Sequence, residues 1–514
     1  MPTARIDSGV DTAMAEPLVQ MSKMKPVHFV DTTLRDGHLS LWACAMRTDW
    51  MLPVATQIDR AGFRAIEIMS TSIPKKMVRE LKEDPWERVR LFAKLAPRTP
   101  LRVIMGRYIT SFEITPDSIT NLWLERLVAN GIREVRMSDC SNTVSVWERL
   151  IRDSRRAGLK IVLNLVFSVS PVHTDDYYAR LARAAAQLDV DRICLKDPGG
   201  LLTPERTRAL VPIVLREAKA IPVEIHTHCT TGLAPLCLLE AIKLGIDIVN
   251  TATPPLANGS SHPSVFTVAE NAIALGYTPT IDLEGLRPVS DHFTRIAGRE
   301  GLPVGMPLEY NEAQYTHQVP GGMISNLRHQ LTQMKMQGRL AEVLEETARV
   351  REELGYPIMV TPYSQFVGVQ AAMNVIIGER YKEITDQIIQ YALGFWGEAE
   401  SAAINPDIRD RILSRPRAKE LARWQPPQPS IAEVRKHLGG AGVGDDELLL
   451  RYLAGTEEVA AMRAAPRSER SVDGRLPLVT LIDELAKRTN LSQIRVEKAG
   501  MMLHLARTGR PAAD

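Results

Sequence analysis

Apolar residues in the first half of the chain fall into short runs that alternate with longer amphipathic segments. Eight runs are short, rich in Val and Ile and bounded by polar or turn residues, which is typical of buried parallel strands. They span residues 28–30, 65–69, 103–105, 134–137, 161–167, 193–195, 223–225 and 246–249. Helical spacing of apolar positions fills the gaps at 50–61, 122–130, 147–157, 177–188, 204–217 and 233–244.

Eight strand–helix alternations within one stretch of chain predict an α/β fold of the (β/α)8 TIM-barrel type over residues 27–300. A doubly wound open sheet is the competing arrangement, but it rarely supplies so many regular units. We therefore expect a closed barrel whose active site lies at the C-terminal ends of the strands.

The apolar period becomes helical from about residue 300, which predicts a C-terminal helical extension over 301–424 with helices at 322–338, 340–354, 363–377, 380–393 and 406–423. Pro- and Gly-rich stretches indicate a linker-rich segment over 425–473. Residues 474–514 form a small C-terminal α+β unit, with a strand pair at 494–507, which is a candidate for partner docking. Residues 1–26 are expected to form a flexible N-terminal arm.

Composition excludes some classes of function. Sixty-three basic and 61 acidic side chains give a net charge of +2, too small to recruit nucleic acid or an anionic membrane. The five cysteines have no paired spacing, which favours reduced thiols and a cytoplasmic location. No apolar run reaches the roughly 18 residues of a membrane helix, so a soluble protein is expected.

Polar residues gather where the predicted strands end, and in a barrel these ends share one rim. They are Asp31, Asp139, Lys196, Asp197, His226, His228, Asn250 and Thr251. Strand alternation turns His226 and His228 to the same side, a geometry suited to two ligands of one divalent ion. Hydrogen-bonded core histidines are the alternative.

Two further residues are candidates for the same ion. Asp36 follows Arg35 and is either a ligand or a salt-bridge partner. Lys196 is either an ion-pair partner of Asp197 or a metal ligand. In the second case its amine loses a proton and reacts with carbon dioxide to become an anionic carbamate.

Several motifs in this order resemble the carboxyltransferase subunits and domains of biotin-dependent enzymes, the family that includes those of pyruvate carboxylase, oxaloacetate decarboxylase and transcarboxylase. The resemblance spans residues 27–398. The motifs are Phe29-Val-Asp-Thr-Thr-Leu-Arg-Asp36, Lys82-Glu-Asp-Pro-Trp-Glu-Arg88, Leu195-Lys-Asp197, Gly200-Leu-Leu-Thr-Pro204, His226-Thr-His228, Val319-Pro-Gly-Gly-Met-Ile-Ser-Asn-Leu327 and Leu354-Gly-Tyr-Pro-Ile-Met-Val-Thr-Pro362.

The resemblance implies a site that makes an enolate and passes a carboxyl group to or from it. Asp36, His226, His228 and a carbamate on Lys196 would hold a divalent metal, zinc, manganese or cobalt. Ser325 matches a hydroxyl, usually threonine, that moves a proton between acceptor and biotin, although a helix N-cap is the alternative reading. We expect catalysis by Arg35, Lys196 and Ser325.

Departures from the family lie around the acceptor site, for which we expect Arg35, Leu39, Met105, Phe112 and Ser325 as lining residues. Pyruvate-using members carry Gln in place of Leu39, Arg in place of Met105 and commonly Tyr in place of Phe112. The loss of polar contacts to a carboxylate predicts an acceptor other than pyruvate. Arg107 is a substitute cation only if its strand turns it towards the mouth.

The expected partners follow from the same resemblance. Met334-Lys-Met336 is in a helical stretch and is not expected to carry biotin, so a biotin carboxyl carrier protein and a biotin carboxylase subunit are predicted partners. The family suggests a homodimer within a larger complex. Two alternatives remain: a metal-dependent lyase, aldolase-type enzyme or biotin-independent decarboxylase on the same barrel, and a non-catalytic scaffold subunit.

Overall fold

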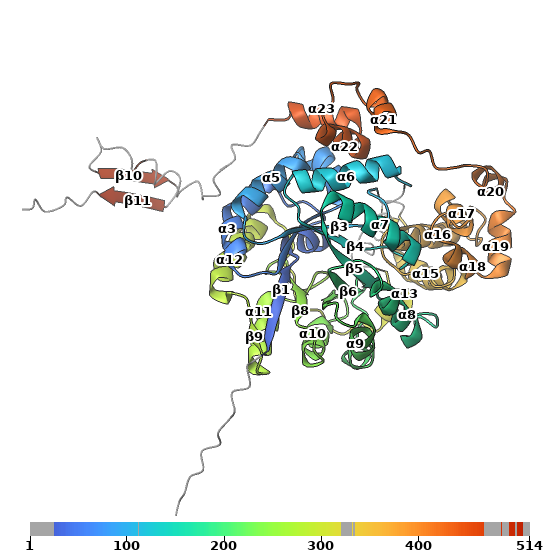
Figure 1. Cartoon of the computed structure of the whole chain (residues 1–514), viewed down its shortest axis with the longest axis horizontal. Coiled ribbons are helices and arrows are strands. Elements are labelled where there is room, and N and C mark those ends of the chain that lie inside the picture. Colours follow the sequence, from blue (N-terminus) through green and yellow to red (C-terminus); the bar gives the residue numbers. More distant parts are fainter. Residues whose placement is uncertain are drawn as a thin grey trace, which may run out of the picture.

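The computed structural model describes residues 25–110, 113–319, 331–332, 335–466, 485, 493–498 and 501–506. Its centre is a closed barrel of eight parallel strands, surrounded by helices (Figure 1). The strands are β1 Pro26–Asp31, β2 Ala65–Ser70, β3 Leu101–Met105, β4 Glu134–Met137, β5 Lys160–Val166, β6 Arg192–Asp197, β7 Val223–Thr227 and β8 Ile248–Thr251. Each strand pairs with the next along the chain, and β1 pairs with both β8 and β2, which closes the ring and confirms the predicted TIM barrel.

Helices of the connections cover the outside of the barrel. They are α2 Thr48–Met51, α3 Ala55–Arg60, α5 Pro85–Leu95, α6 Asp117–Ala129, α7 Val144–Ala157, α8 Asp175–Ala185, α9 Pro204–Ala218, α10 Ala234–Lys243, α11 Val265–Ala274 and α12 Leu283–Glu300. Local signals set their ends: Thr174 accepts a hydrogen bond from the backbone of Tyr177 at the start of α8, and Gly158, at φ 90°, ends α7. A short strand, β9 Thr278–Pro279, extends the sheet beside the start of β1.

Charged side chains fill part of the barrel interior, where aliphatic layers are the usual filling. Arg102 on β3 reaches across to Glu224 on β7 with two hydrogen bonds of 2.7 and 3.0 Å and also contacts Glu134 on β4. Arg136 on β4 donates to Asn250 on β8 at 2.7 Å. All five side chains are buried. Arg102, Glu134 and Glu224 stand at the first or second residue of their strands, so their pairs lie towards the end of the barrel opposite the mouth.

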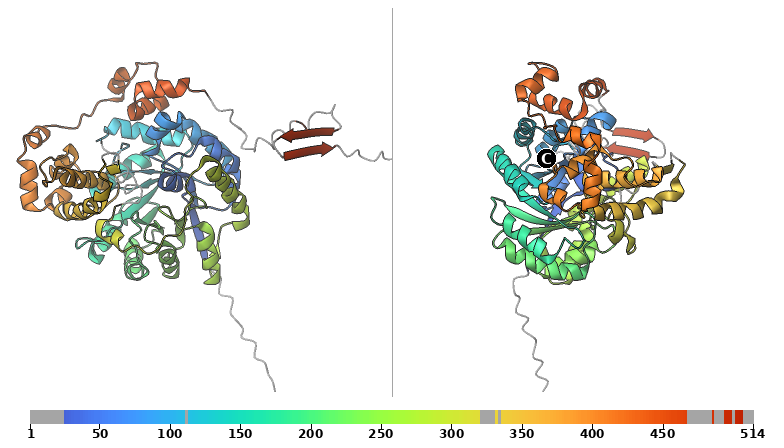
Figure 2. Two further views of the ribbon diagram at one scale, coloured as in Figure 1. Left: turned by 180° about the vertical axis from the view of Figure 1, so that it is seen from behind. Right: turned by 90° about the vertical axis from the view of Figure 1, so that its right-hand side faces the viewer.

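The helical extension packs beside the barrel and has its own aromatic core (Figures 1 and 2). Its helices are α13 Ala313–His317, η4 Gln337–Arg339, α15 Leu340–Glu353, α16 Tyr363–Ile377, α17 Asp386–Ala392, α18 Glu398–Ala402, α19 Pro406–Leu413 and α20 Pro416–Leu421. Buried Tyr363, Phe366, Tyr391 and Trp396 form the centre of this core. Most of the helix expected over 322–338 lies outside the described residues.

The segment over 425–473 differs from the expected linker because it contains three helices, α21 Ile431–His437, α22 Asp445–Ala454 and α23 Thr456–Ala464. Its Pro- and Gly-rich stretches separate these helices, while Leu448, Leu449 and Leu450 pack into the main core of the barrel. The segment therefore extends the barrel, with α22 against α4 Ile73–Lys76 and α6.

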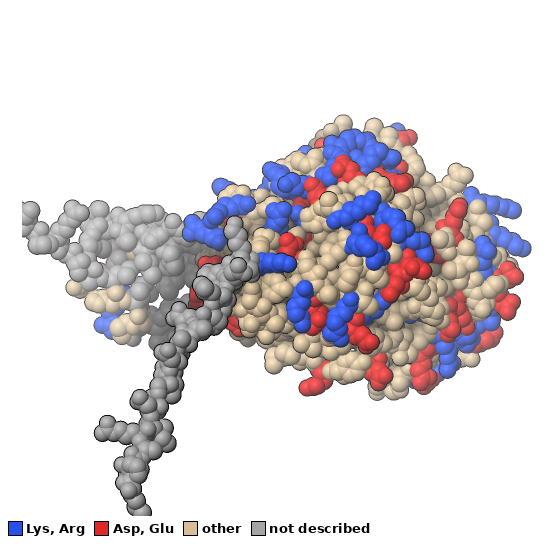
Figure 3. Space-filling view, turned by 60° about the horizontal axis from the view of Figure 1, so that its bottom comes forward, with Lys and Arg blue, Asp and Glu red and all other residues tan. Residues whose placement is uncertain are grey.

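The C-terminal strand pair is present as β10 Gln493–Lys498 and β11 Met501–Ala506, which pair antiparallel. Residues 1–24 of the expected N-terminal arm and, apart from residue 485, the part of the C-terminal unit before residue 493 lie outside the described residues. On the face drawn in Figure 3, basic and acidic side chains are interspersed, in keeping with the small net charge. None of the described helices combines the length and apolarity needed to cross a membrane.

Candidate active site at the barrel mouth

Three of the four predicted metal ligands meet at the C-terminal ends of β1 and β7. Asp36 sits on a π-helical turn, η1 Thr33–Gly37, directly after β1, while His226 lies on β7 and His228 just beyond it. The turn is fixed by backbone hydrogen bonds from Asp36 and Gly37 to the Thr32 carbonyl, of 2.8 and 3.0 Å. Gly37 is required here because a Cβ atom would lie only 2.9 Å from the Leu256 carbonyl oxygen.

A fourth side chain, His262, joins this cluster and was missed by the sequence prediction. The Nε2 atoms of His226, His228 and His262 lie 3.6, 3.4 and 3.5 Å from Asp36 Oδ2. One potential ligand atom from each residue can be chosen so that all four lie within 4.8 Å of one another, and all four residues are buried. Imidazoles and a carboxylate that converge in this way are a donor set suited to a divalent ion.

The protonation of the cluster also suits a cation. Burial would raise the pKa of Asp36, but the Arg35 charge and the neighbouring imidazoles hold that pKa well below the usual carboxylate range. Burial lowers the pKa of His226 and of His262 well below the usual imidazole value. An ionised carboxylate therefore faces the neutral imidazoles of His226 and His262, and these are the forms that bind a metal.

Contacts around the cluster orient its members. Asp36 accepts hydrogen bonds from Arg35 Nη1 at 2.5 Å and from Ser40 Oγ at 2.8 Å. His228 Nδ1 is 2.8 Å from the carbonyl oxygen of Ser260, which accepts its proton and leaves Nε2 free to bind an ion.

Lys196 lies on β6 beside His226 on β7, with which it is in register. Its Nζ donates to Ser138 Oγ at 2.9 Å. Burial, together with the Arg136 and Arg35 charges, lowers the pKa of Lys196 to about 7. The alternative partner, Asp197, is engaged by the backbone of Leu201 and Leu202, so no ion pair between Lys196 and Asp197 forms.

A cavity of about 180 Å³ opens beside the cluster, between the barrel mouth and the helical extension. Arg35, Leu39, Ser138 and Lys196 line it from the barrel, and Trp396 lines it from the extension. Its size suits a small acceptor, and Arg35 connects it to Asp36.

Both arginines that line this cavity are already paired. Arg35 donates to Glu67 through Nε and Nη2 at 2.9 and 2.5 Å, in addition to its bond to Asp36. Arg107 makes a two-pronged pair with Asp139, at 2.9 and 3.2 Å, and also donates to the Trp396 carbonyl. Burial would lower the pKa of Arg107, but Asp139 raises it, so this guanidinium is committed to its carboxylate partner.

The other predicted acceptor contacts fall in different places. Leu39 lines the cavity. Met105 is fully buried in the barrel core, and its neighbours Ile104 and Gly106 line the cavity instead. Phe112 and Ser325 lie outside the described residues.

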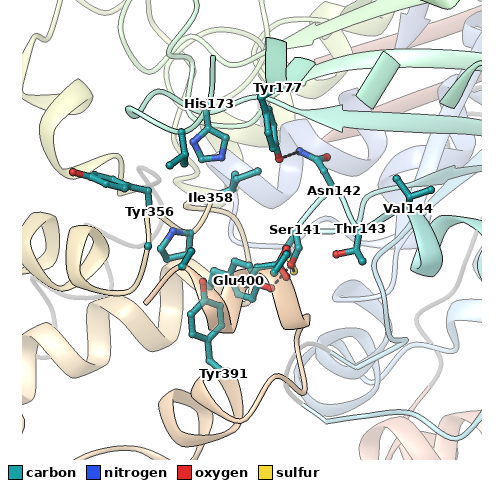
Figure 4. A pocket seen from close by; sticks show the side chains of 17 residues that line it. Ser141, Asn142, Thr143, Val144, His173, Tyr177, Tyr356, Ile358, Tyr391 and Glu400 are labelled. Atoms are coloured by element: carbon teal, nitrogen blue, oxygen red, sulfur yellow. Dashed lines mark hydrogen bonds between the residues drawn. The ribbon is translucent and has the colours of Figure 1, made fainter. Parts of the chain in front are cut away.

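Two further cavities, each of about 340 Å³, adjoin the first. One shares Thr71, Ser72 and Thr110 with it and is closed on the far side by residues 451–455, at the end of α22. The other shares only Cys140 with it and is shown in Figure 4. There Asn142 of the barrel donates to the Tyr177 hydroxyl at 3.1 Å, and Tyr391 and Glu400 of the extension face them.

Comparisons with known proteins identify the family. Residues 315–491 match the conserved carboxylase domain. The chain is 38% identical over 391 residues to a pyruvate carboxylase subunit from Methanocaldococcus jannaschii, covering 75% of this chain and 68% of that protein. It is 31% identical over 441 residues to the methylmalonyl-CoA carboxyltransferase 5S subunit of Propionibacterium freudenreichii subsp. shermanii, covering 84% of this chain and 86% of that protein.

A third relative and a solved structure complete the comparison. The 2-oxoglutarate carboxylase large subunit of Hydrogenobacter thermophilus is 31% identical over 439 residues, covering 84% of this chain and 67% of that protein. The carboxyl transferase domain of Rhizobium etli pyruvate carboxylase has the same fold, with a TM-score of 0.78 at 23% identity, over 96% of this chain and 86% of that one. The chain therefore belongs to the carboxyltransferase family of the biotin-dependent enzymes, and it is an enzyme of that family.

Proposed function

We propose that this enzyme moves a carboxyl group between carboxybiotin on a separate carrier protein and an enolisable carbonyl acceptor other than pyruvate. The partners would be a biotin carboxyl carrier protein and a biotin carboxylase subunit. Relatives named for pyruvate and for 2-oxoglutarate support the idea that the acceptor changes while the fold is kept.

The metal part of the proposal rests on the buried cluster. Asp36, His226 and His228 would hold a divalent ion, with a carbamate on Lys196 as a further ligand. A bound ion would act as a Lewis acid on the acceptor carbonyl. Arg35 and Ser40 hold the Asp36 carboxylate in place, and Ser138 directs the Lys196 side chain towards the cavity. Ser325 is proposed as the group that carries a proton between acceptor and biotin.

The acceptor part rests on one observation, the pairing of both cavity arginines with buried carboxylates. An acceptor carboxylate would have to compete with Glu67 and Asp36 for Arg35, or with Asp139 for Arg107. Leu39 adds an apolar surface in the same cavity. A neutral ketone, amide or acyl thioester therefore fits this cavity better than a 2-oxo acid.

The test begins with affinity purification of the native enzyme, a biotin blot and identification of the subunits that accompany it. The assembled complex is then assayed for kcat/KM with pyruvate, simple ketones, amides and acyl thioesters. Turnover of a neutral acceptor with pyruvate at background supports the proposal. Pyruvate carboxylation at the efficiency of the family would overturn the changed acceptor, and full activity without a biotinylated partner would favour the lyase alternative.

A further inference from the structure

His262 is placed as firmly as the two histidines that the sequence predicts as ligands. It lies on the loop after β8, where its backbone carbonyl accepts a hydrogen bond of 2.6 Å from Asn258. Its side chain is fully buried, and its Nε2 lies 3.0 Å from His226 Nε2. Two ligand atoms, each about 2.1 Å from the same ion, are about 3.0 Å apart when the ligand–ion–ligand angle is a right angle. The observed spacing therefore suits two ligands of a single ion.

The hydrogen bonds on the other side of the ring fix which nitrogen of His262 is free. The Thr32 hydroxyl donates its only proton to the Thr251 carbonyl, at 2.9 Å. Its oxygen therefore accepts from His262 Nδ1, which is 2.5 Å away. With the proton on Nδ1, the neutral ring carries its lone pair on Nε2, pointing into the cluster.

Within the cluster, the lone pair on His262 Nε2 has two possible partners, a proton on His226 Nε2 or a bound metal ion. His226 Nδ1 lies near both a donor, Arg136 at 2.9 Å, and an acceptor, Asn250 Oδ1 at 3.1 Å. If Arg136 donates to it, His226 Nε2 carries a proton and donates to His262. If His226 binds a metal through Nε2, its proton lies on Nδ1 towards Asn250, no other member of the described cluster donates to His262 Nε2, and the ion would then satisfy it.

We infer that His262 is a ligand of the metal. It would add a third imidazole to those of His226 and His228, beside the carboxylate of Asp36. This inference rests on the metal site of the proposed function, and it assigns His262 a role that the family resemblance did not supply. A nitrogen-rich set favours zinc or cobalt over manganese, because imidazole suits the former and oxygen ligands the latter.

The test counts imidazoles directly. The full chain is loaded with cobalt or zinc, the dissociation constant is measured by competition with a chelator, and X-ray absorption spectroscopy reports the number of imidazole ligands. Three are expected in the wild type. His262→Leu should show two imidazole ligands, and its affinity for the metal should be about 100-fold lower. That loss is at the upper end of what removing a supporting contact alone costs. His292→Leu is the matched control, because His292 is also buried but, among the described residues, its hydrogen bond is to the Trp50 carbonyl, at 2.8 Å, and it is not part of the cluster.

A second variant covers the case in which His262→Leu does not fold. Thr32→Val keeps the volume of the side chain but removes the acceptor of the His262 Nδ1 proton, and it should weaken metal binding by about tenfold. Two imidazoles in the wild type, or unchanged affinity in either variant, would overturn the role of His262. Three imidazoles without any carboxyl transfer would instead refute the proposed function and leave the ligand assignment standing.

Discussion

The two sides of the barrel mouth use their polar groups in opposite ways. In the cluster of Asp36, His226, His228 and His262, three imidazole nitrogens and one carboxylate oxygen converge. In the adjacent cavity, the guanidinium groups of Arg35 and Arg107 are already bound to carboxylates of the protein. The first arrangement presents donors for a cation, whereas the second has both of its guanidinium groups neutralised.

This difference separates the chemistry of the family from its specificity. In the proposed function, stabilising an enolate requires the cluster, so its donors would be tied to the reaction itself. Recognising a particular acceptor requires only contacts at the cavity, and these change without loss of the chemical step. The comparison predicts that substitutions in the cluster reduce turnover of every acceptor, and that substitutions in the cavity change which acceptor is used.

Asp36→Asn should have the largest effect. It removes the charge at which the three imidazoles meet, so metal content should fall and kcat/KM should drop about 10³-fold for every acceptor. Ser40→Ala, which removes only the 2.8 Å hydrogen bond to Asp36, should cost about tenfold. Metal analysis and steady-state kinetics measure the effects of both variants. If Asp36→Asn lost activity with one acceptor alone, the proposed separation between chemistry in the cluster and specificity in the cavity would be contradicted.

Arg107→Met should affect stability more than acceptor binding. It leaves the buried Asp139 carboxylate without its arginine, which should lower the free energy of unfolding by about 3 kcal/mol. That figure is at the low end for a broken buried pair because the Thr143 backbone still donates to Asp139, at 2.7 Å. Denaturant unfolding gives the value. The double variant Arg107→Met/Asp139→Leu should recover most of it, because no buried charge is then left unpaired.

The kinetics of these two variants decide between a structural and a binding role for Arg107. If it clamps an acceptor carboxylate, the double variant will be stable but its KM for the acceptor will rise by tenfold or more, roughly what one charged hydrogen bond contributes. An unchanged KM in the folded double variant is the outcome that the structure favours.

The barrel could be predicted because the strand signal is strong and local. The predicted run at 134–137 coincides with β4, and the runs at 65–69 and 223–225 end within two residues of β2 and β7. The same alternation that defines a strand places His226 and His228 on one side, so their pairing was also within reach of the sequence.

What the sequence missed depends on contacts between distant segments. His262 follows β8 by eleven residues, in a loop whose path no local pattern sets, so only the folded chain brings it to Asp36. Similarly, the spacing of Arg102 does not reveal that it crosses the barrel to Glu224. The direction of Arg107 was undecided because it lies just beyond the end of β3, where strand alternation no longer applies.

Leu39→Gln should have the smallest effect and tests the cavity alone. Leu39 lines the cavity, so a glutamine there offers an amide donor to an acceptor carboxylate without touching the cluster. One added hydrogen bond is worth about 1 kcal/mol, so kcat/KM for pyruvate should rise about fivefold while that for a neutral acceptor falls. Leu41→Gln is the control, since Leu41 lies on the same short helix, α1 His38–Leu41, and packs against the same core as Leu39, but its side chain lies against Gly259 and Gly305 and is not among the residues that line the cavity. Equal changes in kcat/KM for pyruvate and for neutral acceptors would mean that residue 39 does not contact the acceptor carboxylate. The altered specificity would then have to come from other residues.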